Sequence, residues 1–343
     1  MPVHQSQMRR EVLEIPDAVE RLLTKGVQAI ADTAQDIRAQ DPAFLATVAR
    51  GSSDHVATYL KYASELLMRV PVASIGPSVA SIYKTPLKLK GCTCISVSQS
   101  GQSPDIVEMA KAARSGGALT VAITNHPESP LAGASAHCLN IHAGPETSVA
   151  ATKTFVTSAV AGLMLIAQWR GDTDLIAAIH GLPDQLARAT RIDWPQVRAA
   201  LAGWQSLYTL GRGPVFAISN EAALKFKETA QIHAESYSSA EVLHGPVSIV
   251  DTGFPVLGFA AGDAAEALLV SVADQVAAKG AAVFVTSPMA TRAQSIECVR
   301  TSHPLTDPIA LIVSFYAMVE QVAIARGFDP DVPRHLKKVT ETV

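Results

Sequence analysis

An internal repeat constrains the fold of this chain more than any other feature. The segment Leu45–Gly51 (LATVARG) resembles Leu207–Gly213 (LYTLGRG), which lies 162 positions further along. Two more pairs of segments keep the same spacing: Thr93–Val97 with Pro255–Phe259, and Val121–Thr124 with Val283–Thr286. Apolar strands can resemble each other by chance, but here an Arg-Gly pair recurs in register. The repeat therefore predicts two copies of one domain.

The local pattern predicts that each copy is an α/β domain. Short apolar runs end in Gly, Ser or Thr, and longer Ala-rich stretches with helical spacing follow them. This alternation is typical of βα units and of a parallel sheet flanked by helices. The expected strands are Phe44–Ala49, Pro71–Ile75, Thr93–Ser98, Leu119–Thr124, Cys138–Ile141, Ser206–Leu210, Val215–Ala217, Val247–Val250, Val256–Phe259 and Ala282–Thr286. The expected helices are Asp17–Gln40, Asp54–Met68, Ser103–Arg114, Ala150–Trp169, Asn220–Glu235, Asp263–Ala278 and Pro308–Ala325.

The length supports two domains, since 343 residues allow about two at roughly 150 residues each. The boundary is expected near Leu182–Trp194, a stretch that contains Pro183 and is followed by Pro195. The predicted organisation is an N-terminal helical segment, a first domain, a second domain and a C-terminal tail, at residues 1–30, 31–182, 195–328 and 329–343.

The composition argues against several classes of protein. With 48% apolar and 17% charged residues, the chain is globular and not disordered. A formal net charge of −3 argues against a protein that binds nucleic acid through bulk positive charge. The apolar runs around Ala159–Ala167 and Ala310–Val319 are shorter than the roughly 18 residues of a membrane span, and Met1–Glu14 has no apolar signal core. We therefore expect a cytoplasmic protein with no nucleic-acid or membrane partner.

The sequence predicts neither a metal site nor a cofactor. The four cysteines form no CxxC pair, and the ten histidines are scattered without the spacing of a zinc site. Cys92 and Cys94 lie in the apolar run Cys92–Val97, where they would point to one face of a strand. We expect them to be buried thiols in a reducing compartment.

Two polar loops of the first copy follow expected strands and precede expected helices: Gly51–Ser53 and Ser98–Ser103 (SQSGQS). Such loops can bind an anion through backbone N–H groups, hydroxyls and the helix dipole. No Gly-Lys-Ser/Thr follows, so a phosphomonoester fits better than a nucleotide. Neighbouring parallel strands would bring both loops to one edge of the sheet. The alternative is an ordinary serine N-cap. In the second copy the equivalent residues, Ala260–Ala265, lack the hydroxyls.

The densest polar segment is Asn220–Pro246, whose first half is an expected helix. Lys225 lies four residues after Glu221 and three before Glu228, so the three side chains share a face. A lysine and a glutamate together can move a proton next to a carbonyl group, because the carboxylate accepts the proton and the ammonium stabilises the enolate-like oxygen. Ordinary ion pairs on a solvated helix face are the alternative. His244 lies in a Gly-Pro turn and has either a structural or a catalytic role.

These residues and motifs together resemble the sugar-isomerase (SIS) family. The chain looks most similar to the isomerase half of glutamine–fructose-6-phosphate aminotransferase and to free-standing glucosamine-6-phosphate deaminases. The resemblance covers nearly the whole chain and includes these segments: Met8–Pro16, Gly51–Ser53, Ser98–Ser103, Ala143–Phe155, Leu210–Gly213, Glu221–Pro246 and the terminal DPDVPRHLKK. It implies two tandem flavodoxin-like SIS domains.

The resemblance also implies roles for individual residues. The residues that match phosphate- or sugar-binding positions are Ser53, Ser98, Gln99, Ser100, Ser103 and Val149. Glu228 matches the base that moves a proton between carbons 1 and 2 of the open-chain sugar, and Lys225 matches the lysine beside it. His244 matches a ring-opening histidine that reaches in from a neighbouring subunit, which implies a homodimer with shared active sites. Lys338 matches a tail lysine that can form a Schiff base with the ketose.

The chain departs from the synthase pattern at several positions. Position 2 is Pro2 and the first cysteine is Cys92, so we expect no glutamine hydrolysis by an N-terminal cysteine. Ala151 replaces a sugar-contacting serine, Gln102 replaces an acidic residue, and Lys337 lies beside Lys338. These changes affect the choice of substrate more than the phosphate site.

The sequence thus leaves several functions open. The first is a phosphosugar isomerase/deaminase that converts glucosamine 6-phosphate to fructose 6-phosphate and ammonia. The second acts on galactosamine 6-phosphate or on fructosamine 6-phosphate adducts with the same residues. The third is a sugar-phosphate sensor without turnover, which would not need Lys225, Glu228, His244 and Lys338. Simple aldose–ketose isomerisation is a further possibility.

Overall fold

The computed structural model describes residues 5–338, which form two compact units. The N-unit consists of Asp17–Glu146, Lys153–His180 and, among the described tail residues, Lys337 and Lys338. The C-unit consists of residues 5–16, Thr147–Thr152 and Gly181–Leu336. The short segment Thr147–Thr152 therefore belongs to the C-unit although the chain on both sides of it belongs to the N-unit.

The N-unit contains a five-stranded parallel sheet in the order β2-β1-β3-β4-β5. Its strands are β1 (Phe44–Val48), β2 (Val72–Ser74), β3 (Cys92–Val97), β4 (Leu119–Thr124) and β5 (His137–Asn140). Every residue of the central strand β3 is buried. Strands buried on both faces read as continuous apolar runs, which is how the sequence predicted them.

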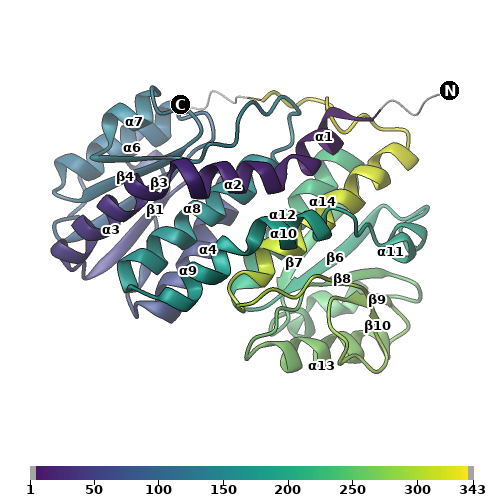
Figure 1. The fold of residues 1–343 in the computed structure, drawn as a ribbon. Coiled ribbons are helices and arrows are strands. Elements are labelled where there is room, and N and C mark those ends of the chain that lie inside the picture. Colours follow the sequence, from purple (N-terminus) through teal and green to yellow (C-terminus); the bar gives the residue numbers. More distant parts are fainter. Residues whose placement is uncertain (1–4, 339–343) are drawn as a thin grey trace. The chain divides into compact units, whose positions relative to one another are not determined.

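Helices cover both faces of this sheet (Figure 1). They are α2 (Ile15–Lys25, with the N-unit from Asp17), α3 (Val27–Gln40), α4 (Ser52–Leu67), α5 (Ser78–Ser81), α6 (Pro104–Ser115), α7 (Pro130–Ala134), α8 (Lys153–Arg170) and α9 (Thr173–His180). On one face, Ile106, Met109 and Ala110 of α6 pack in one apolar cluster with Ala46 and Cys94 of the sheet. Helices α3 and α4 both pack against the buried helix α8.

The C-unit repeats this topology, with the sheet order β10-β9-β8-β6-β7, all parallel. Its strands are β6 (Ser206–Gly211), β7 (His233–Ser238), β8 (Pro255–Gly258), β9 (Ala282–Val285) and β10 (Gln294–Ser295). Its helices are α1 (Gln7–Leu13), α10 (Leu182–Ala189), α11 (Pro195–Ala200), α12 (Pro214–Ala230), α13 (Glu266–Ala277) and α14 (Asp307–Ala325), with short 3-10 helices at Val242–His244 and Pro246–Ile249.

The 162-residue spacing survives in the three-dimensional structure. Helix α6 begins at Pro104 and α13 at Glu266, and β1 begins at Phe44 and β6 at Ser206, so each pair of elements is offset by that spacing. Gly51 and Gly213, which end the Arg-Gly pairs, both have positive φ, of 55° and 66°. The prediction of two copies of one α/β domain with parallel sheets is confirmed.

Some expected elements differ in the C-unit. Val215–Ala217 is not a strand but lies in α12, which Pro214 begins at the first helical position. The helix ends at Ala230 because Gln231 takes a left-handed conformation, and β7 follows where we expected more helix. Val247–Val250 is not a strand either, since Pro246–Ile249 forms a 3-10 helix.

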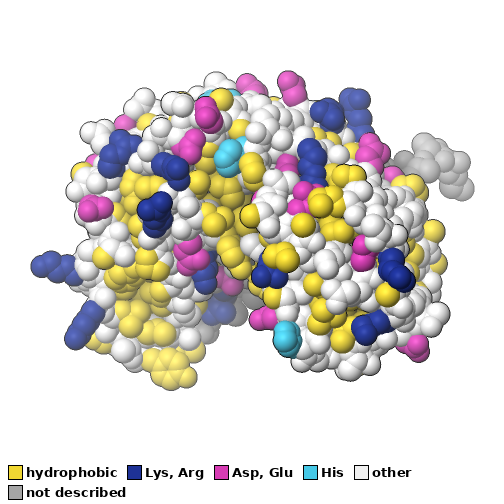
Figure 2. Space-filling model, turned by 90° about the horizontal axis from the view of Figure 1, so that it is seen from below, with side chains coloured by type: hydrophobic (Ala, Val, Ile, Leu, Met, Phe, Trp, Pro, Cys, Tyr) yellow, Lys and Arg dark blue, Asp and Glu magenta, His cyan; other side chains and the backbone are white. Residues whose placement is uncertain are grey.

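One described helix, α14, has the length and hydropathy of a membrane span, although 83% of its apolar window is buried inside the protein. Phe315 of α14 packs edge-on against Phe226 of α12, with ring centroids 5.1 Å apart. This helix is therefore a core element of the C-unit. On the surface, basic and acidic side chains are interspersed over the face shown in Figure 2.

Candidate active site

Two polar loops meet at one edge of the N-unit sheet. The loop 50–53 follows β1, and Ser98–Ser103, which we call the serine loop, follows β3. Strands β1 and β3 are parallel neighbours, so their carboxyl ends lie side by side. Ser53 lies in the first turn of α4, and Ser103 is the N-cap of α6. Two helix N-termini and several hydroxyls thus share one edge, an arrangement that suits an anion.

An ion pair that the sequence analysis missed joins the two loops. Arg50 follows β1, and its Nε donates to Oδ2 of Asp105 at 2.5 Å. Its Nη2 also pairs with this carboxylate. Asp105 lies in the first turn of α6 and is fully buried. Because two bonds from one planar guanidinium fix direction as well as distance, this pair holds the two helix N-termini in a defined geometry.

Hydrogen bonds within the serine loop leave hydroxyl protons available to a ligand. Ser98 Oγ accepts from the N–H of Gly101, and Ser100 Oγ accepts from the N–H of Gln102, both at 3.2 Å. The Gln99 carbonyl accepts from the Asn125 N–H at 3.1 Å. A hydroxyl that accepts one bond can still donate its own proton. Backbone hydrogen bonds therefore hold the serine loop in place, and its serine hydroxyls can donate to a ligand.

Gly101 gives the serine loop its tight turn. Its φ is +62°, and a Cβ at this position would lie 2.1 Å from the Ser129 Oγ. No other residue type fits here without moving its neighbours. The close approach brings the backbone of the loop against Ser129, the N-cap of α7.

The C-unit loop equivalent to the serine loop is already occupied by carboxylates of its own chain. The N–H of Gly262 donates to Oδ2 of Asp307 at 2.8 Å, and the N–H of Ala265 donates to Oδ1 of Asp263 at 2.8 Å. Arg300 also bonds to Asp307, at 3.2 Å. The absence of hydroxyls at Ala260–Ala265 predicted that the second copy lacks the anion-binding loop of the first. The structure agrees, because N–H groups of this loop are bonded to Asp263 and Asp307.

Lys225 and Glu228 are brought together on α12 of the C-unit. Nζ of Lys225 forms a very short hydrogen bond with Oε2 of Glu228 and lies 3.3 Å from Oε1 of Glu221. The side chains of Lys225 and Glu221 are 1% and 0% exposed, whereas that of Glu228 is 22% exposed. Tyr316 of α14 donates to Glu221 at 3.1 Å. The glutamate is therefore the member of the pair that solvent reaches.

Electrostatics keep Lys225 charged. Burial alone would lower its pKa, but the carboxylates of Glu221 and Glu228 more than compensate and raise the pKa of Lys225 above its ordinary value. A lysine that stays protonated can donate hydrogen bonds and stabilise negative charge, but it cannot act as a nucleophile. The cluster thus offers one fixed cation with a partly exposed carboxylate beside it.

The structure places the remaining predicted residues in other segments. His244 is exposed at the end of a 3-10 helix, where its backbone N–H donates to the Glu241 carbonyl at 2.9 Å. Among the described residues, no side chain bonds to its imidazole. Val149 belongs to the C-unit, and its N–H donates to the carbonyl of Asp331 in the tail at 3.1 Å. The Asp331 carboxylate in turn accepts from the N–H groups of Gln7 and Met8, each at 2.7 Å.

Lys338 pairs with a second residue that the sequence analysis missed. Its Nζ lies 2.8 Å from Oε2 of Glu146, a fully buried side chain of the N-unit. Glu146 lies in the run Ala143–Phe155 that carried the family resemblance, and this was the signal that could have directed attention to it.

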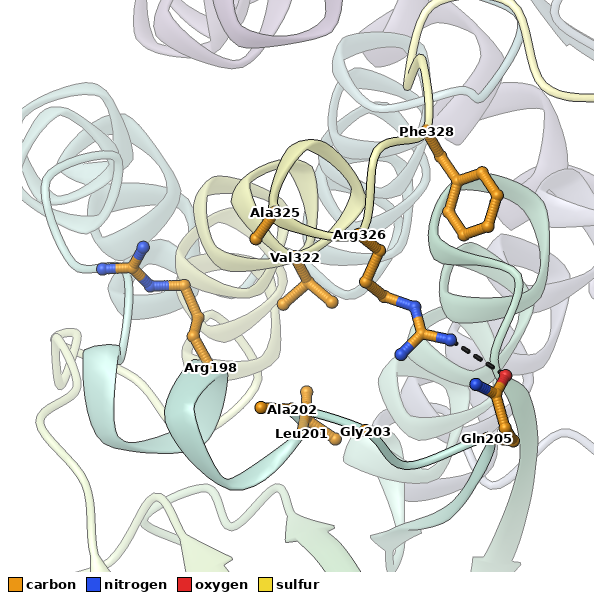
Figure 3. Close-up of a pocket in the computed structure, with 9 residues that line it drawn as sticks. All are labelled: Arg198, Leu201, Ala202, Gly203, Gln205, Val322, Ala325, Arg326 and Phe328. Atoms are coloured by element: carbon orange, nitrogen blue, oxygen red, sulfur yellow. Dashed lines mark hydrogen bonds between the residues drawn. The ribbon is translucent and has the colours of Figure 1, made fainter.

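A pocket of about 450 Å³ in the C-unit contains none of the predicted site residues (Figure 3). It lies beside α11 and the end of α14, with Arg198 and Arg326 at its sides and Val322 and Leu201 between them. The Arg326 guanidinium is bonded to Gln205 and to the carbonyls of Ala230 and Trp204. The guanidinium of Arg326 thus joins neighbouring segments of the C-unit.

Comparisons with known proteins agree with this architecture. The family model described as SIS domain matches residues 43–168 and 200–325. Glutamine–fructose-6-phosphate aminotransferase (isomerizing) of Sulfurisphaera tokodaii is 30% identical over 351 residues, which cover 96% of this chain and 56% of that protein. The chain thus spans about half the length of the curated relatives it matches.

Two solved structures are similar over nearly the whole chain. One is a protein of Silicibacter pomeroyi DSS-3 assigned as a phosphosugar isomerase, with 65% identity, a TM-score of 0.93, and coverage of 95% of this chain and 100% of that one. The other is the C-terminal domain of glucosamine-fructose-6-phosphate aminotransferase from Francisella tularensis, with 25% identity, a TM-score of 0.84, and coverage of 96% and 99%. Both likenesses extend over the two units described above.

Proposed function

This chain belongs to the SIS domain family, and from that premise we propose that it is a phosphosugar isomerase that deaminates an amino-sugar phosphate. The observation that carries the proposal is the pair of Lys225 and Glu228, in which a buried cation lies beside a carboxylate that solvent reaches. Such a pair can move a proton between two neighbouring carbon atoms of a sugar, because the carboxylate accepts the proton and the ammonium stabilises the negative oxygen. A purely structural ion pair would not need its carboxylate to be more exposed than its lysine.

The proposed substrate is glucosamine 6-phosphate, and its phosphate binds at the serine loop. Ser98, Ser100 and Ser103 donate hydroxyl protons, Ser53 and Gln99 add polar contacts, and the N-termini of α4 and α6 favour the negative charge. The loop hydrogen bonds and the Arg50–Asp105 ion pair support this role, because they hold the donors in place before the ligand arrives. The assignment of Val149 to the sugar is part of the same proposal.

The proposed reaction is a 1,2-proton transfer followed by hydrolysis. His244 assists ring opening, which exposes the aldehyde at carbon 1. Glu228 removes the proton from carbon 2 and returns it to carbon 1, while Lys225 stabilises the enolamine oxygen. The imine that results at carbon 2 adds water and releases ammonia, which leaves fructose 6-phosphate.

An assay of both products tests this proposal. Purified protein is incubated with glucosamine 6-phosphate, and ammonia and fructose 6-phosphate are measured together. We expect equal amounts of the two products. If galactosamine 6-phosphate or a fructosamine 6-phosphate adduct turns over while glucosamine 6-phosphate does not, the substrate assignment is wrong and the reaction class stands. If no compound of this panel turns over but the phosphosugars raise the melting temperature, the protein is a sensor and the proposed function is wrong.

We further propose a cytoplasmic homodimer in which His244 completes the site of the neighbouring subunit. The exposure of His244 and the absence of a partner for its imidazole within the described chain support this proposal. Glu228→Gln and His244→Ala chains should each be inactive alone. Co-expressed, they should recover about a quarter of the wild-type activity, because half of the dimers are mixed and each of these has one intact site. No recovery in verified mixed dimers would show that each subunit supplies its own histidine.

A further inference from the structure

The C-terminal tail ends, among the described residues, in an ion pair inside the N-unit. Nζ of Lys338 lies 2.8 Å from Oε2 of Glu146. The Glu146 side chain is 0% exposed, and that of Lys338 is 24% exposed. The two residues are 192 positions apart in the sequence. The amine of Lys338 is thus held at the surface of the N-unit by a carboxylate that lies below it.

Glu146 is itself fixed by the beginning of a long helix. The N–H of Thr154, in the first turn of α8, donates to Oε1 of Glu146 at 3.0 Å, and the Thr154 hydroxyl donates to Oε2 at 2.7 Å. The positive end of the helix dipole adds to this stabilisation. Both oxygens of the carboxylate are therefore held in position before the lysine binds.

Charge at this carboxylate is stabilised although the residue is buried. Burial by itself would raise the pKa of Glu146, but Lys338 and the two bonds from Thr154 hold it below its ordinary value. Neutral groups of the protein supply part of this stabilisation. Glu146 is therefore held as a charged carboxylate beside the Lys338 ammonium.

The contact selects one of the basic residues of the tail. His335 and Lys337 are exposed, whereas Lys338 is half-buried against Glu146. A tail that needed only a non-specific attachment could use Lys337 equally well. The structure instead pairs a buried carboxylate with the lysine that we place in Schiff-base chemistry, and Lys337 provides a matched control.

We propose that Glu146 holds the Lys338 amine in position and takes the proton that this amine must lose before it attacks a ketose phosphate. This inference deepens the proposed function and rests on it for the identity of the sugar. The ammonium of Lys338 passes one proton to the Glu146 carboxylate. The nitrogen lone pair then forms a bond to carbon 2 of the ketose, and the C=O electrons move to the oxygen. Glu146 returns its proton to that oxygen and takes a second proton from the nitrogen. It passes this second proton to the same oxygen, which leaves as water, so that a protonated Schiff base remains and Glu146 is again a carboxylate.

Reductive trapping tests the proposal independently of turnover. The full chain is incubated with fructose 6-phosphate and sodium cyanoborohydride, and the adduct is located by peptide mass spectrometry. We expect labelling of Lys338 in the wild type and none at that position in Lys338→Arg. In Glu146→Gln, the amide oxygen can accept from the Thr154 N–H while the amide NH2 donates to the Thr154 hydroxyl. Labelling near pH 7 should fall by about tenfold or more in this variant, as expected for the loss of a general base. Lys337→Gln should label like the wild type.

The pH dependence separates a proton acceptor from a simple anchor. In Glu146→Gln, labelling should recover as the pH approaches the ordinary lysine pKa of about 10.4, because the amine then loses its proton to solvent. If labelling of Lys338 in Glu146→Gln is reduced by the same factor at every pH, Glu146 only anchors the tail, and its role in proton transfer is overturned. Equal labelling of wild type and Glu146→Gln would overturn both roles.

The outcomes also distinguish this proposal from the proposed function. Release of ammonia from glucosamine 6-phosphate without any labelling of Lys338 would leave the function standing and overturn the inference. Labelling of Lys338 that depends on Glu146, without release of ammonia, would support the inference and refute the deaminase. Melting temperatures of the variants, with and without fructose 6-phosphate, verify that each chain is folded and binds the probe.

Discussion

Replacing Glu228 with glutamine should lower the release of ammonia from glucosamine 6-phosphate by about 10²–10⁴-fold, the range that a general base typically contributes. The amide keeps the size of the side chain and can still accept a hydrogen bond from Lys225, but it cannot take a proton from carbon 2. Steady-state kinetics of the purified variant measure the effect, which should appear in kcat.

Binding of the phosphosugar should survive the same substitution. The proposed phosphate contacts belong to the serine loop of the N-unit, whereas Glu228 belongs to the C-unit. The rise in melting temperature that fructose 6-phosphate causes should therefore match that of the wild type. Glu297→Gln, a change at an exposed carboxylate of the same unit, is the matched control and should leave both readouts unchanged. Turnover at the wild-type rate in Glu228→Gln would exclude Glu228 as the base.

Replacing Lys225 with methionine should lower the free energy of unfolding by about 3–5 kcal/mol, the usual cost of removing one partner from a buried ion pair. Methionine fills much of the volume of the lysine, so the loss is mainly electrostatic. Glu221 would remain fully buried without its cation, and Glu228 would lose its nearest one. Urea denaturation followed by circular dichroism measures the change.

Two further variants show whether the loss comes from uncompensated charge. Lys225→Met combined with Glu221→Gln removes a buried cation and a buried anion together, so it should be more stable than Lys225→Met alone. Lys111→Met breaks an ion pair with Glu108 whose side chains are 58% and 46% exposed, and it should cost less than about 1 kcal/mol. If Lys225→Met and Lys111→Met are equally stable, the buried cluster contributes nothing beyond a surface pair.

Much of the fold could be predicted because it depends on local patterns. Parallel strands that are buried on both faces read as short apolar runs, and β1, β3 and β4 were predicted to within one residue at either end. The strand β7 was missed because HAESYS contains helix-favouring residues directly after a helix. Its conformation is decided by pairing with β6, which is a tertiary effect. The repeat itself could have shown it, since Val72–Ser74 of β2 falls on residues 234–236 at the same spacing.

The sequence by itself determined what depends on short separations along the chain. Lys225 and Glu228 are three residues apart on one helix, and helical geometry brings such neighbours together wherever the helix lies. Each of the loops after β1 and β3 was predicted from a local pattern of strand, polar loop and helix, whereas their meeting at one edge depends on the pairing of β1 with β3. Three contacts were decided only by the tertiary structure. They are the ion pair of Arg50 with Asp105, the hydrogen bond from Tyr316 to Glu221, and the ion pair of Lys338 with Glu146. These partners lie 55 to 192 positions apart. Their contacts follow from the packing of whole elements, which no local spacing encodes.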